Sequence, residues 1–181
     1  MSGGTDSSVA AMLLQEQGYE VVGITFRFFD EQKNTESPHI QEARELASKL
    51  NIEHHVYDAR TAFQTEVIDY FINEYLSGRT PFPCVKCNNF LKWNFLVSLA
   101  DKYGCERIAT GHYARITKKN GFFYISEAAD NDKDQTFFLW GLPQHVLQRA
   151  MLPLGDFTKT EIRKMAAERG FVQIAEKKDS M

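Results

Sequence analysis

The stretch SGGTDSSVAAMLLQEQGYEVVGITFRF, residues 2–28, decides the fold, because a glycine-rich turn, a helical pattern and a strand pattern follow one another directly. Val9, Met12 and Leu13 form an apolar stripe with helical spacing, and Gly18 stands where the residue after a helix end is expected. Residues 21–28 form an apolar run that is typical of a buried strand. This order predicts part of an α/β fold.

The same alternation continues along the chain. Helices are predicted around 40–50, 63–71, 91–99 and 158–169, strands at 52–57 and 107–110, and an Asn-Gly hairpin at 115–125. Strands alternating with helices predict the α/β class, with a doubly wound parallel sheet and flanking helices. We also expect that a first strand is missing before Ser2 and that the chain is cut at Met181, where no helix stop is seen.

Composition favours a cytoplasmic globular protein. Of 181 residues, 43% are hydrophobic and 25% charged, and no apolar run reaches membrane-spanning length, so no membrane partner is expected. No charged-then-apolar stretch opens the sequence, so a secretory leader is not expected. The three cysteines, Cys84, Cys87 and Cys105, are too few for a disulfide-stapled fold. In a reducing compartment, the pair Cys84 and Cys87 points to a metal, a cluster or thiol chemistry.

The charges are unevenly distributed. Residues 1–76 carry 13 acids and 5 bases, whereas residues 77–119 carry 8 bases and 2 acids, and residues 159–178 add 6 bases against 3 acids. A local basic surface allows polyanion binding even though the net charge of the whole chain is −3. Solvated basic helix faces remain an equal alternative.

The glycine-rich turn has the features of an anion site. Gly3 and Gly4 let the backbone approach a ligand closely, and the free N–H groups of the following helix favour an anion. Ser2, Ser7 and Ser8 can donate hydrogen bonds to phosphate oxygens. The Gly-Lys-Ser/Thr ending of the P-loop is absent. A Gly-Gly turn with an Asp or Ser cap is the structural alternative.

The cysteine segment follows two stiffening prolines, Pro81 and Pro83. Cys87 is predicted near a helix start and follows Lys86, and both features lower the pKa of a thiol. A zinc knuckle is the alternative, although no second pair of ligands is present in the sequence. Cys105 is expected to be a buried packing residue.

Five motifs then point to one family. SGGTDSS (2–8) resembles the pyrophosphate loop of the ATP pyrophosphatase superfamily, in which ATP is split at its α phosphate. Together with GRTPFPCVKCN (78–88), ATGHYAR (109–115), KDQTFFL (133–139) and KKDS (177–180), the loop occurs in the order and spacing of the bacterial tRNA 2-thiouridylase (TrmU) family. The resemblance covers nearly the whole chain and implies a fold similar to the adenine nucleotide α-hydrolases. It makes residues 1–181 the catalytic domain, with about 143–181 leading toward a central domain, and β-rich C-terminal domains beyond this chain.

The resemblance implies that ATP adenylates the C2 oxygen of uridine 34 in the tRNAs for Lys, Glu and Gln, and that a cysteine persulfide then delivers sulfur. The chemistry is reasonable, since the oxygen of a urea-like carbonyl must first become a good leaving group. A sulfur-relay protein or a cysteine desulfurase would supply the persulfide.

The resemblance also assigns roles to individual residues. Cys87 is the nucleophile, and Asp6 serves the magnesium ion of Mg–ATP. The implied ATP contacts are Ser2, Gly3, Gly4, Asp6, Ser7, Ser8, Phe26 and Gly111. The implied tRNA contacts are Phe82, Pro83, Cys84, His112, Lys133, Asp134 and Gln135. From the residues alone, His112 is better interpreted as a satisfied loop histidine, and Asp134 as part of a solvated acidic turn with Asp130 and Asp132.

Two departures from the family pattern matter. Many members carry aspartate where Cys84 stands, so we expect another base, or a Cys87 thiolate generated by Lys86 and the helix start. The family's persulfide-bearing cysteine lies beyond Lys177–Ser180, so this chain is expected to bind nucleotide without completing thiolation. Cys84, Cys87 and that further cysteine could also hold an iron–sulfur cluster. Two competing interpretations are a C–N bond-forming ATP pyrophosphatase and a metal-stabilised RNA-binding module without ATP chemistry.

Overall fold

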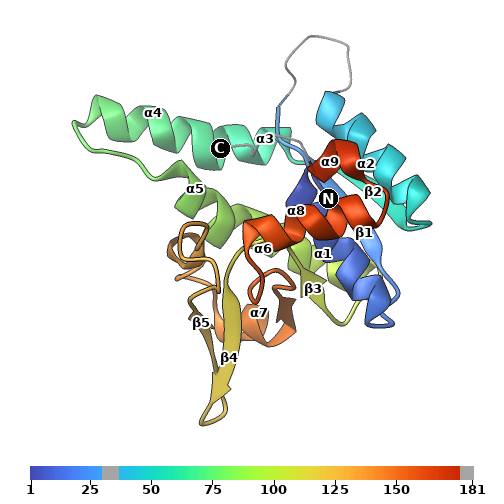
Figure 1. Cartoon of the computed structure of the whole chain (residues 1–181). Coiled ribbons are helices and arrows are strands. Elements are labelled where there is room, and N and C mark those ends of the chain that lie inside the picture. Colours follow the sequence, from blue (N-terminus) through green and yellow to red (C-terminus); the bar gives the residue numbers. More distant parts are fainter. Residues whose placement is uncertain (30–36, 176–181) are drawn as a thin grey trace.

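The structure is a computed structural model that describes residues 1–29 and 37–175 of the chain (Figure 1). Helices and parallel strands alternate through the first half, and a hairpin and further helices follow, which confirms the predicted α/β class. The KKDS motif at 177–180 lies outside the described residues. No helix in the described ranges is long and apolar enough to cross a membrane.

The first parallel pair forms as predicted. It is built from α1 (Thr5–Glu16), β1 (Val22–Arg27), α2 (Pro38–Lys49) and β2 (Glu53–Asp58). The two strands pair in parallel, with Val22 opposite Glu53 and Arg27 opposite Asp58. Met1 lies beside β1, because its amine donates to the Ile24 carbonyl and its carbonyl accepts from Thr25 Oγ1 at 2.7 Å. The glycine-rich turn is therefore attached to the edge of β1.

Two long helical segments follow in the middle of the sequence, and each contains a π-helical turn. The first comprises α3 (Arg60–Phe63), η1 (Gln64–Ile68) and α4 (Asp69–Leu76), and the second α5 (Pro83–Lys86), η2 (Cys87–Lys92) and α6 (Trp93–Lys102). Pro83 occupies the first turn of its segment, where proline loses no helical hydrogen bond. The sequence predicted both helices but neither π turn.

A second parallel pair and the hairpin complete the strands. β3 (Ile108–Ala109) pairs with β6 (Ala150–Met151), which the sequence did not predict. β4 (Arg115–Lys119) and β5 (Phe122–Ser126) form the predicted hairpin. Asn120 and Gly121 have φ values of 52° and 82°, as a type I′ turn requires. The parallel strands thus lie in two separate two-stranded pairs.

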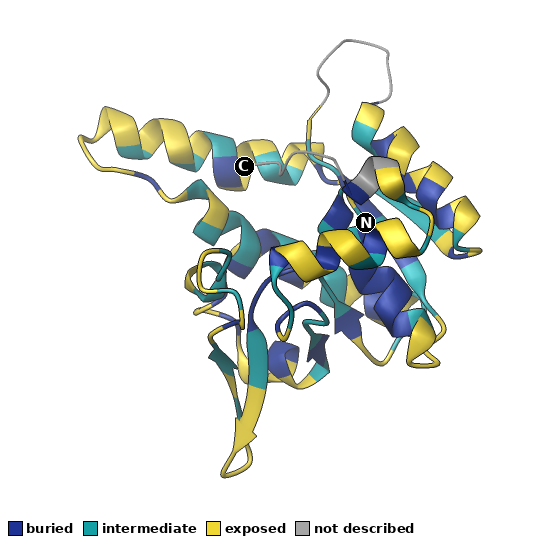
Figure 2. Ribbon diagram, viewed as in Figure 1, coloured by how far each residue is buried: buried dark blue, intermediate teal, exposed yellow. Residues whose placement is uncertain are grey.

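The last helices fold back onto the first. The connection from β5 contains η3 (Thr136–Phe138) and α7 (Gln144–Arg149), and then α8 (Lys159–Glu168) and α9 (Val172–Ala175) follow. Thr158 and Glu161 form a capping box that starts α8. Ile162 and Ala166 of α8 are fully buried in one core cluster with Val9 of α1 (Figure 2). At the far end Arg169 donates to both Glu16 carboxylate oxygens at 2.6 and 2.7 Å. One side of α1 is therefore covered by a segment more than 150 positions away in the sequence.

Candidate nucleotide and thiol site

The glycine-rich turn ends in a helix start whose N–H groups receive no side-chain cap. Gly3 has φ 69°, and a Cβ atom there would lie 2.8 Å from Glu42 Cβ, so both conformation and space require glycine. The hydroxyl groups bond locally: Ser8 Oγ donates to the Gly4 carbonyl at 2.6 Å, and Ser2 Oγ lies 3.0 Å from Ser7 Oγ. Three hydroxyl groups and an uncapped helix start thus surround one short loop, an arrangement suited to an anion.

Asp6 is held by two partners from distant segments. Lys159 Nζ lies 2.8 and 2.9 Å from its two carboxylate oxygens, and the Tyr113 hydroxyl donates to Oδ1 at 2.8 Å. The Lys159 side chain is 10% exposed and that of Asp6 34%. The Lys159 backbone N–H also donates to Asp130 Oδ2. The structure therefore places an ion pair where the sequence predicted a carboxylate dedicated to magnesium.

The loop after β3 packs directly on the glycine-rich turn. A Cβ atom on Gly111 would lie 2.9 Å from both the Asp6 carbonyl carbon and the Ser7 nitrogen. The next residue, His112, is buried, and its Nδ1 lies 2.8 Å from Thr110 Oγ1. Its ring stacks on Trp93, with centroids 6.5 Å apart. Burial first, and then the charge of Lys92, lowers the pKa of His112 well below 6.5. The sequence-based interpretation as a satisfied loop histidine fits this environment, and contact with tRNA stays a prediction.

The cysteine segment differs from the prediction in its local electrostatics. The helix begins at Pro83, so Cys87 follows the single turn of α5 and starts η2 instead of standing at a helix start. Cys84 is exposed and Cys87 half-buried. Burial raises the pKa of the Cys87 thiol, Lys92 opposes this rise, and Cys84 adds to it. The expectation of a thiol pKa lowered by the helix start and Lys86 was therefore wrong.

Lys86 is directed away from Cys87. Its Nζ lies 3.5 Å from Glu66 Oε2 and 4.8 Å from the centre of the Phe90 ring. A cation that is shared between a carboxylate and an aromatic face contributes little field at a third group. The cation that acts on Cys87 is Lys92, at the other end of η2.

The Lys-Asp-Gln segment at 133–135 is held in place by hydrogen bonds of its own side chains. Asp134 accepts hydrogen bonds from the backbone N–H groups of Ala128 and Thr136 at 2.8 and 3.0 Å. Burial raises the pKa of Asp134, but hydrogen bonds from Thr136 and Ala128 outweigh it and lower that pKa overall. Gln135 Oε1 accepts from the Tyr113 N–H at 3.0 Å. Asp134 is therefore a loop-stabilising residue, not the freely solvated one that the acidic-turn interpretation expected.

Phe26 lies inside an aromatic cluster at the end of β1. Its ring stacks on Phe28 at 5.4 Å and contacts Tyr57 and Phe95 at 5.9 and 6.1 Å. It is only 9% exposed. The predicted adenine contact would therefore use the rim of this cluster.

The model of the tRNA methyl transferase HUP domain matches residues 1–181. The chain belongs to this family.

Curated relatives of this HUP domain are named for thiolation. It is 55% identical over 181 residues to "tRNA-specific 2-thiouridylase MnmA 2" of Phocaeicola vulgatus, 57% to "MnmA 1" of Bacteroides fragilis and 48% to the MnmA of Cytophaga hutchinsonii. These matches cover 99–100% of the chain but 49–51% of the relatives. The chain thus spans about half the length of the curated relatives it matches.

Solved structures share the fold of the HUP domain. A predicted tRNA methyltransferase subunit from Methanocaldococcus jannaschii aligns with a TM-score of 0.56 at 23% identity, covering 92% of this chain and 72% of that one. The NMN synthetase of Francisella tularensis aligns with a TM-score of 0.54 at 21% identity, covering 99% and 63%. At these identities the likeness establishes the fold alone.

The HUP domain joins the glycine-rich turn, the loop after β3 and the helix that carries Cys87 in one contact network. The glycine-rich turn touches Gly111, and His112 stacks on Trp93, which directly follows η2. Sequence analysis missed Lys92, Trp93, Tyr113 and Lys159. The Thr158-x-x-Glu161 capping pattern is the one sequence signal of a helix start at Lys159. No local pattern indicates that Lys159 pairs with Asp6.

The described side chains offer no complete set of ligands for a metal ion. Within residues 1–29 and 37–175 no group of three or more His, Cys, Asp and Glu side chains could hold a metal ion. Cys84 and Cys87 supply two thiols, fewer than a zinc site or an iron–sulfur cluster takes from protein. The described part of the HUP domain thus gives the cluster hypothesis no support. Cys105, the third cysteine, is partly buried against the core, in agreement with a packing role.

Proposed function

We propose that the intact protein carrying this HUP domain is an ATP-dependent tRNA 2-thiouridylase. The observation that carries the proposal is the contact network that joins the glycine-rich turn, the Gly111 loop and the Cys87 helix. A glycine-rich loop joined to a cysteine helix in this way supports activation by ATP followed by attack of sulfur, because the two steps need both groups close together. The 46–57% identity to proteins named 2-thiouridylases supports the same chemistry.

The β and γ phosphates of ATP would bind at the start of α1. The hydroxyl groups of Ser2, Ser7 and Ser8 would give up their present hydrogen bonds, to one another and to the backbone, and donate to phosphate oxygens instead. The N–H groups of Gly3 and Gly4 would donate to the same phosphates. Asp6 is partly exposed beside them, and carboxylate oxygens suit magnesium, so this donor set fits Mg–ATP. When bound, the ion would neutralise the triphosphate charge. Lys159 would hold the Asp6 carboxylate in place.

The adenosine part of ATP would lie between two predicted contacts. Phe26 stands at the carboxyl end of β1, and Gly111 follows the end of β3. Ligands of parallel α/β folds bind at the carboxyl ends of the strands. Both positions therefore fit a nucleotide whose triphosphate sits on α1.

In the proposed reaction, the C2 oxygen of uridine 34 in the tRNAs for Lys, Glu and Gln attacks the α phosphorus, and pyrophosphate leaves. A persulfide sulfur then bonds to C2, and the bond from C2 to oxygen breaks, so that AMP departs with that oxygen. The Cys87 thiolate would then act as a nucleophile on the inner sulfur of the persulfide, so that the S–S bond breaks, a disulfide to Cys87 forms and the outer sulfur remains on C2 as 2-thiouridine. A sulfur-relay protein or a cysteine desulfurase would supply the sulfur.

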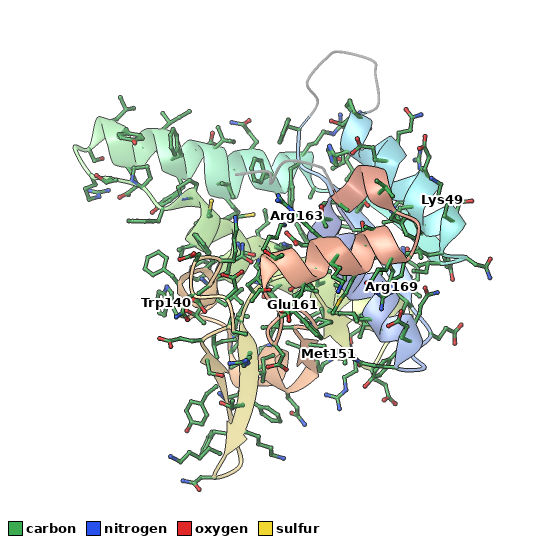
Figure 3. All side chains as sticks on the ribbon, in the orientation of Figure 1. Lys49, Trp140, Met151, Glu161, Arg163 and Arg169 are labelled. Atoms are coloured by element: carbon green, nitrogen blue, oxygen red, sulfur yellow. The ribbon has the colours of Figure 1, made fainter. Side chains whose placement is uncertain are left out.

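Exposed aromatic rings near the cysteine segment support binding of unpaired RNA bases. Phe82 and Phe137 are 54% and 56% exposed, and their ring centres lie 5.6 Å apart. The Trp140 side chain, 70% exposed, lies at the outer edge of the same loop region (Figure 3). Single-stranded RNA is commonly held by stacking on such rings. Pro83, Cys84, Lys133 and Gln135 lie on the two segments that carry Phe82 and Phe137, where they would meet the tRNA.

The proposal is tested with the intact protein, unmodified tRNA, Mg–ATP and a persulfide donor, followed by nucleoside mass spectrometry. Formation of 2-thiouridine by the parent, and not by Cys87→Ser, is the expected result. Cys105→Ser is the matched control and should thiolate normally, because Cys105 is partly buried against the core, in agreement with a packing role. If AMP and pyrophosphate form on a small amine acceptor while tRNA is left unchanged, the protein belongs to the C–N bond-forming class instead.

A further inference from the structure

The π-helical turn η2 begins at Cys87 and ends at Lys92. Hydrogen bonds in a π-helix join residues five positions apart. Lys92 therefore lies about one turn after Cys87 along the helix. In an α-helix of about 3.6 residues per turn, residues five apart point in clearly different directions. The wider turn therefore brings Cys87 and Lys92 nearer to one face of the helix than an α-helix would.

The backbone of this turn is held firmly. Asn89 Nδ2 donates to the carbonyls of Val85 and Phe138 at 3.0 and 3.2 Å, and its Oδ1 accepts from the Gly141 N–H at 3.1 Å. Leu91 and Trp93, on either side of Lys92, are buried. The position of Lys92 relative to Cys87 is thus set by packing on both sides.

Lys92 makes no ion pair with a carboxylate anywhere in the described part of the chain. The charge of its ammonium acts on the Cys87 thiol, the His112 ring and the Met1 amine. Burial lowers the pKa of Lys92, and Cys87 opposes that shift. A partly buried ammonium is stabilised by a nearby anion, and Cys87 is the one neighbour here that becomes an anion by losing a proton.

The other groups around Cys87 do not supply a counter-charge. Lys86 is taken up by Glu66 and the Phe90 ring. Cys84, on the preceding turn, disfavours a second negative charge. The charge of Lys92 adds to burial in lowering the pKa of His112 and of the Met1 amine, that of the amine to about 5.

We propose that Lys92 is the counter-ion of the Cys87 sulfur, a positioning residue that offsets part of the cost of ionising this thiol within the buried site. The significance of this role for sulfur transfer rests on the proposed function, whereas the pairing itself does not. Lys92 would also supply part of the positive charge beside Cys87 that the sequence analysis expected from Lys86.

The pairing is tested by the pH dependence of iodoacetamide alkylation at Cys87, without ATP or tRNA. Trypsin cleavage after Lys86 separates Cys84 from Cys87, so mass spectrometry follows each thiol alone. Lys92→Met is expected to move the Cys87 profile to higher pH and to slow alkylation at pH 7.5 about tenfold, as for a thiol pKa one unit higher. Lys92→Arg keeps the charge and should stay near the parent. Lys86→Met, with adducts located by fragmentation, should leave the profile unchanged.

The proposal is overturned if the pH profile of Cys87 alkylation in Lys92→Met matches that of the parent. It is also overturned if the profile of Lys92→Arg is displaced as far as that of Lys92→Met. If Lys92→Met does not fold, the thermal stabilities of Cys87→Asp and Cys87→Asn decide. These side chains have nearly equal size, and only aspartate supplies an anion, so Cys87→Asp should be the more stable at pH 7. An aspartate variant that is no more stable overturns the pairing. Loss of thiolation with an unchanged alkylation result would instead count against the proposed function.

Discussion

Lys159 Nζ lies 2.8 Å from Asp6 Oδ1, and this ion pair joins the start of α8 to the start of α1 across 153 positions of sequence. The lysine side chain is 10% exposed, so the pair is largely shielded on that side. The glycine-rich turn is therefore supported by the last long helix and not only by its own backbone.

Replacing Lys159 should destabilise the domain measurably. Lys159→Met removes both hydrogen bonds to the Asp6 carboxylate and is expected to lower the free energy of unfolding by about 1–3 kcal/mol. The matched control is Lys164→Met on the same helix, whose exposed ion pair with Glu168 spans 3.8 Å and contributes at most about 0.5 kcal/mol. Urea unfolding of the two variants checks this. Equal losses would mean that the Asp6 pair carries no special weight.

Enlarging Gly111 should impair nucleotide binding. In Gly111→Ala the added Cβ would lie 2.9 Å from the Asp6 carbonyl carbon and the Ser7 nitrogen, so the turn must shift. We expect ATP affinity, measured by calorimetry, to fall about tenfold or more, equal to about 1.4 kcal/mol. Gly18→Ala serves as the control, since its positive φ costs stability while its Cβ meets nothing within 4 Å. Normal ATP affinity in Gly111→Ala would remove this loop from the nucleotide site.

His112 should make stability depend on pH. Its pKa in the folded protein lies well below 6.5, so the unfolded chain takes up a proton near pH 6.5 while the folded chain does not. Folding is therefore destabilised as the pH falls below 6.5, by about 1.4 kcal/mol per pH unit until the folded-state pKa is reached. Comparing chemical unfolding at pH 7.5 and 5.5, His112→Asn should lose less stability than the parent. His145→Asn, at an exposed position of α7, should behave like the parent, and equal losses in both variants would contradict the account.

Removing the Phe137 ring should weaken binding of tRNA. Phe137 is 56% exposed and contacts Phe82, and stacking of a base on an aromatic ring contributes about 1–3 kcal/mol. Phe137→Ala in the intact protein is thus expected to raise the dissociation constant for tRNA about 5- to 150-fold in a filter-binding assay. Tyr19→Ala, at an exposed aromatic beyond the end of α1, is the control. An unchanged dissociation constant for Phe137→Ala would exclude this surface.

Regular periodicity made most of the fold predictable from sequence. The helix after the glycine-rich turn, the strand to Phe28 and the Asn120-Gly121 hairpin all depend on local spacing or turn chemistry, and each forms as expected. β6 was missed because it has only two residues, Ala150 and Met151, and exists through its pairing with β3. The π turns were missed because apolar spacing does not distinguish one wide turn within a longer helix.

The site was predictable in its motifs but not in its electrostatics. The sequence places Lys86 next to Cys87, yet this side chain pairs with Glu66, and Lys92 is the cation that opposes the rise in the pKa of Cys87. Likewise, no local pattern relates Lys159 to Asp6. Side-chain partners depend on which surfaces meet after folding, and that information is spread over the whole chain.

The central claim is that ATP activates the C2 oxygen of a tRNA uridine. The most direct measurement uses tRNA that carries oxygen-18 at C2 of uridine 34, with the intact protein, Mg–ATP and a persulfide donor. Mass spectrometry of the released nucleotide should find the label in the phosphate of AMP, in step with the 2-thiouridine formed. Thiolated tRNA accompanied by unlabelled AMP would contradict adenylation of this oxygen.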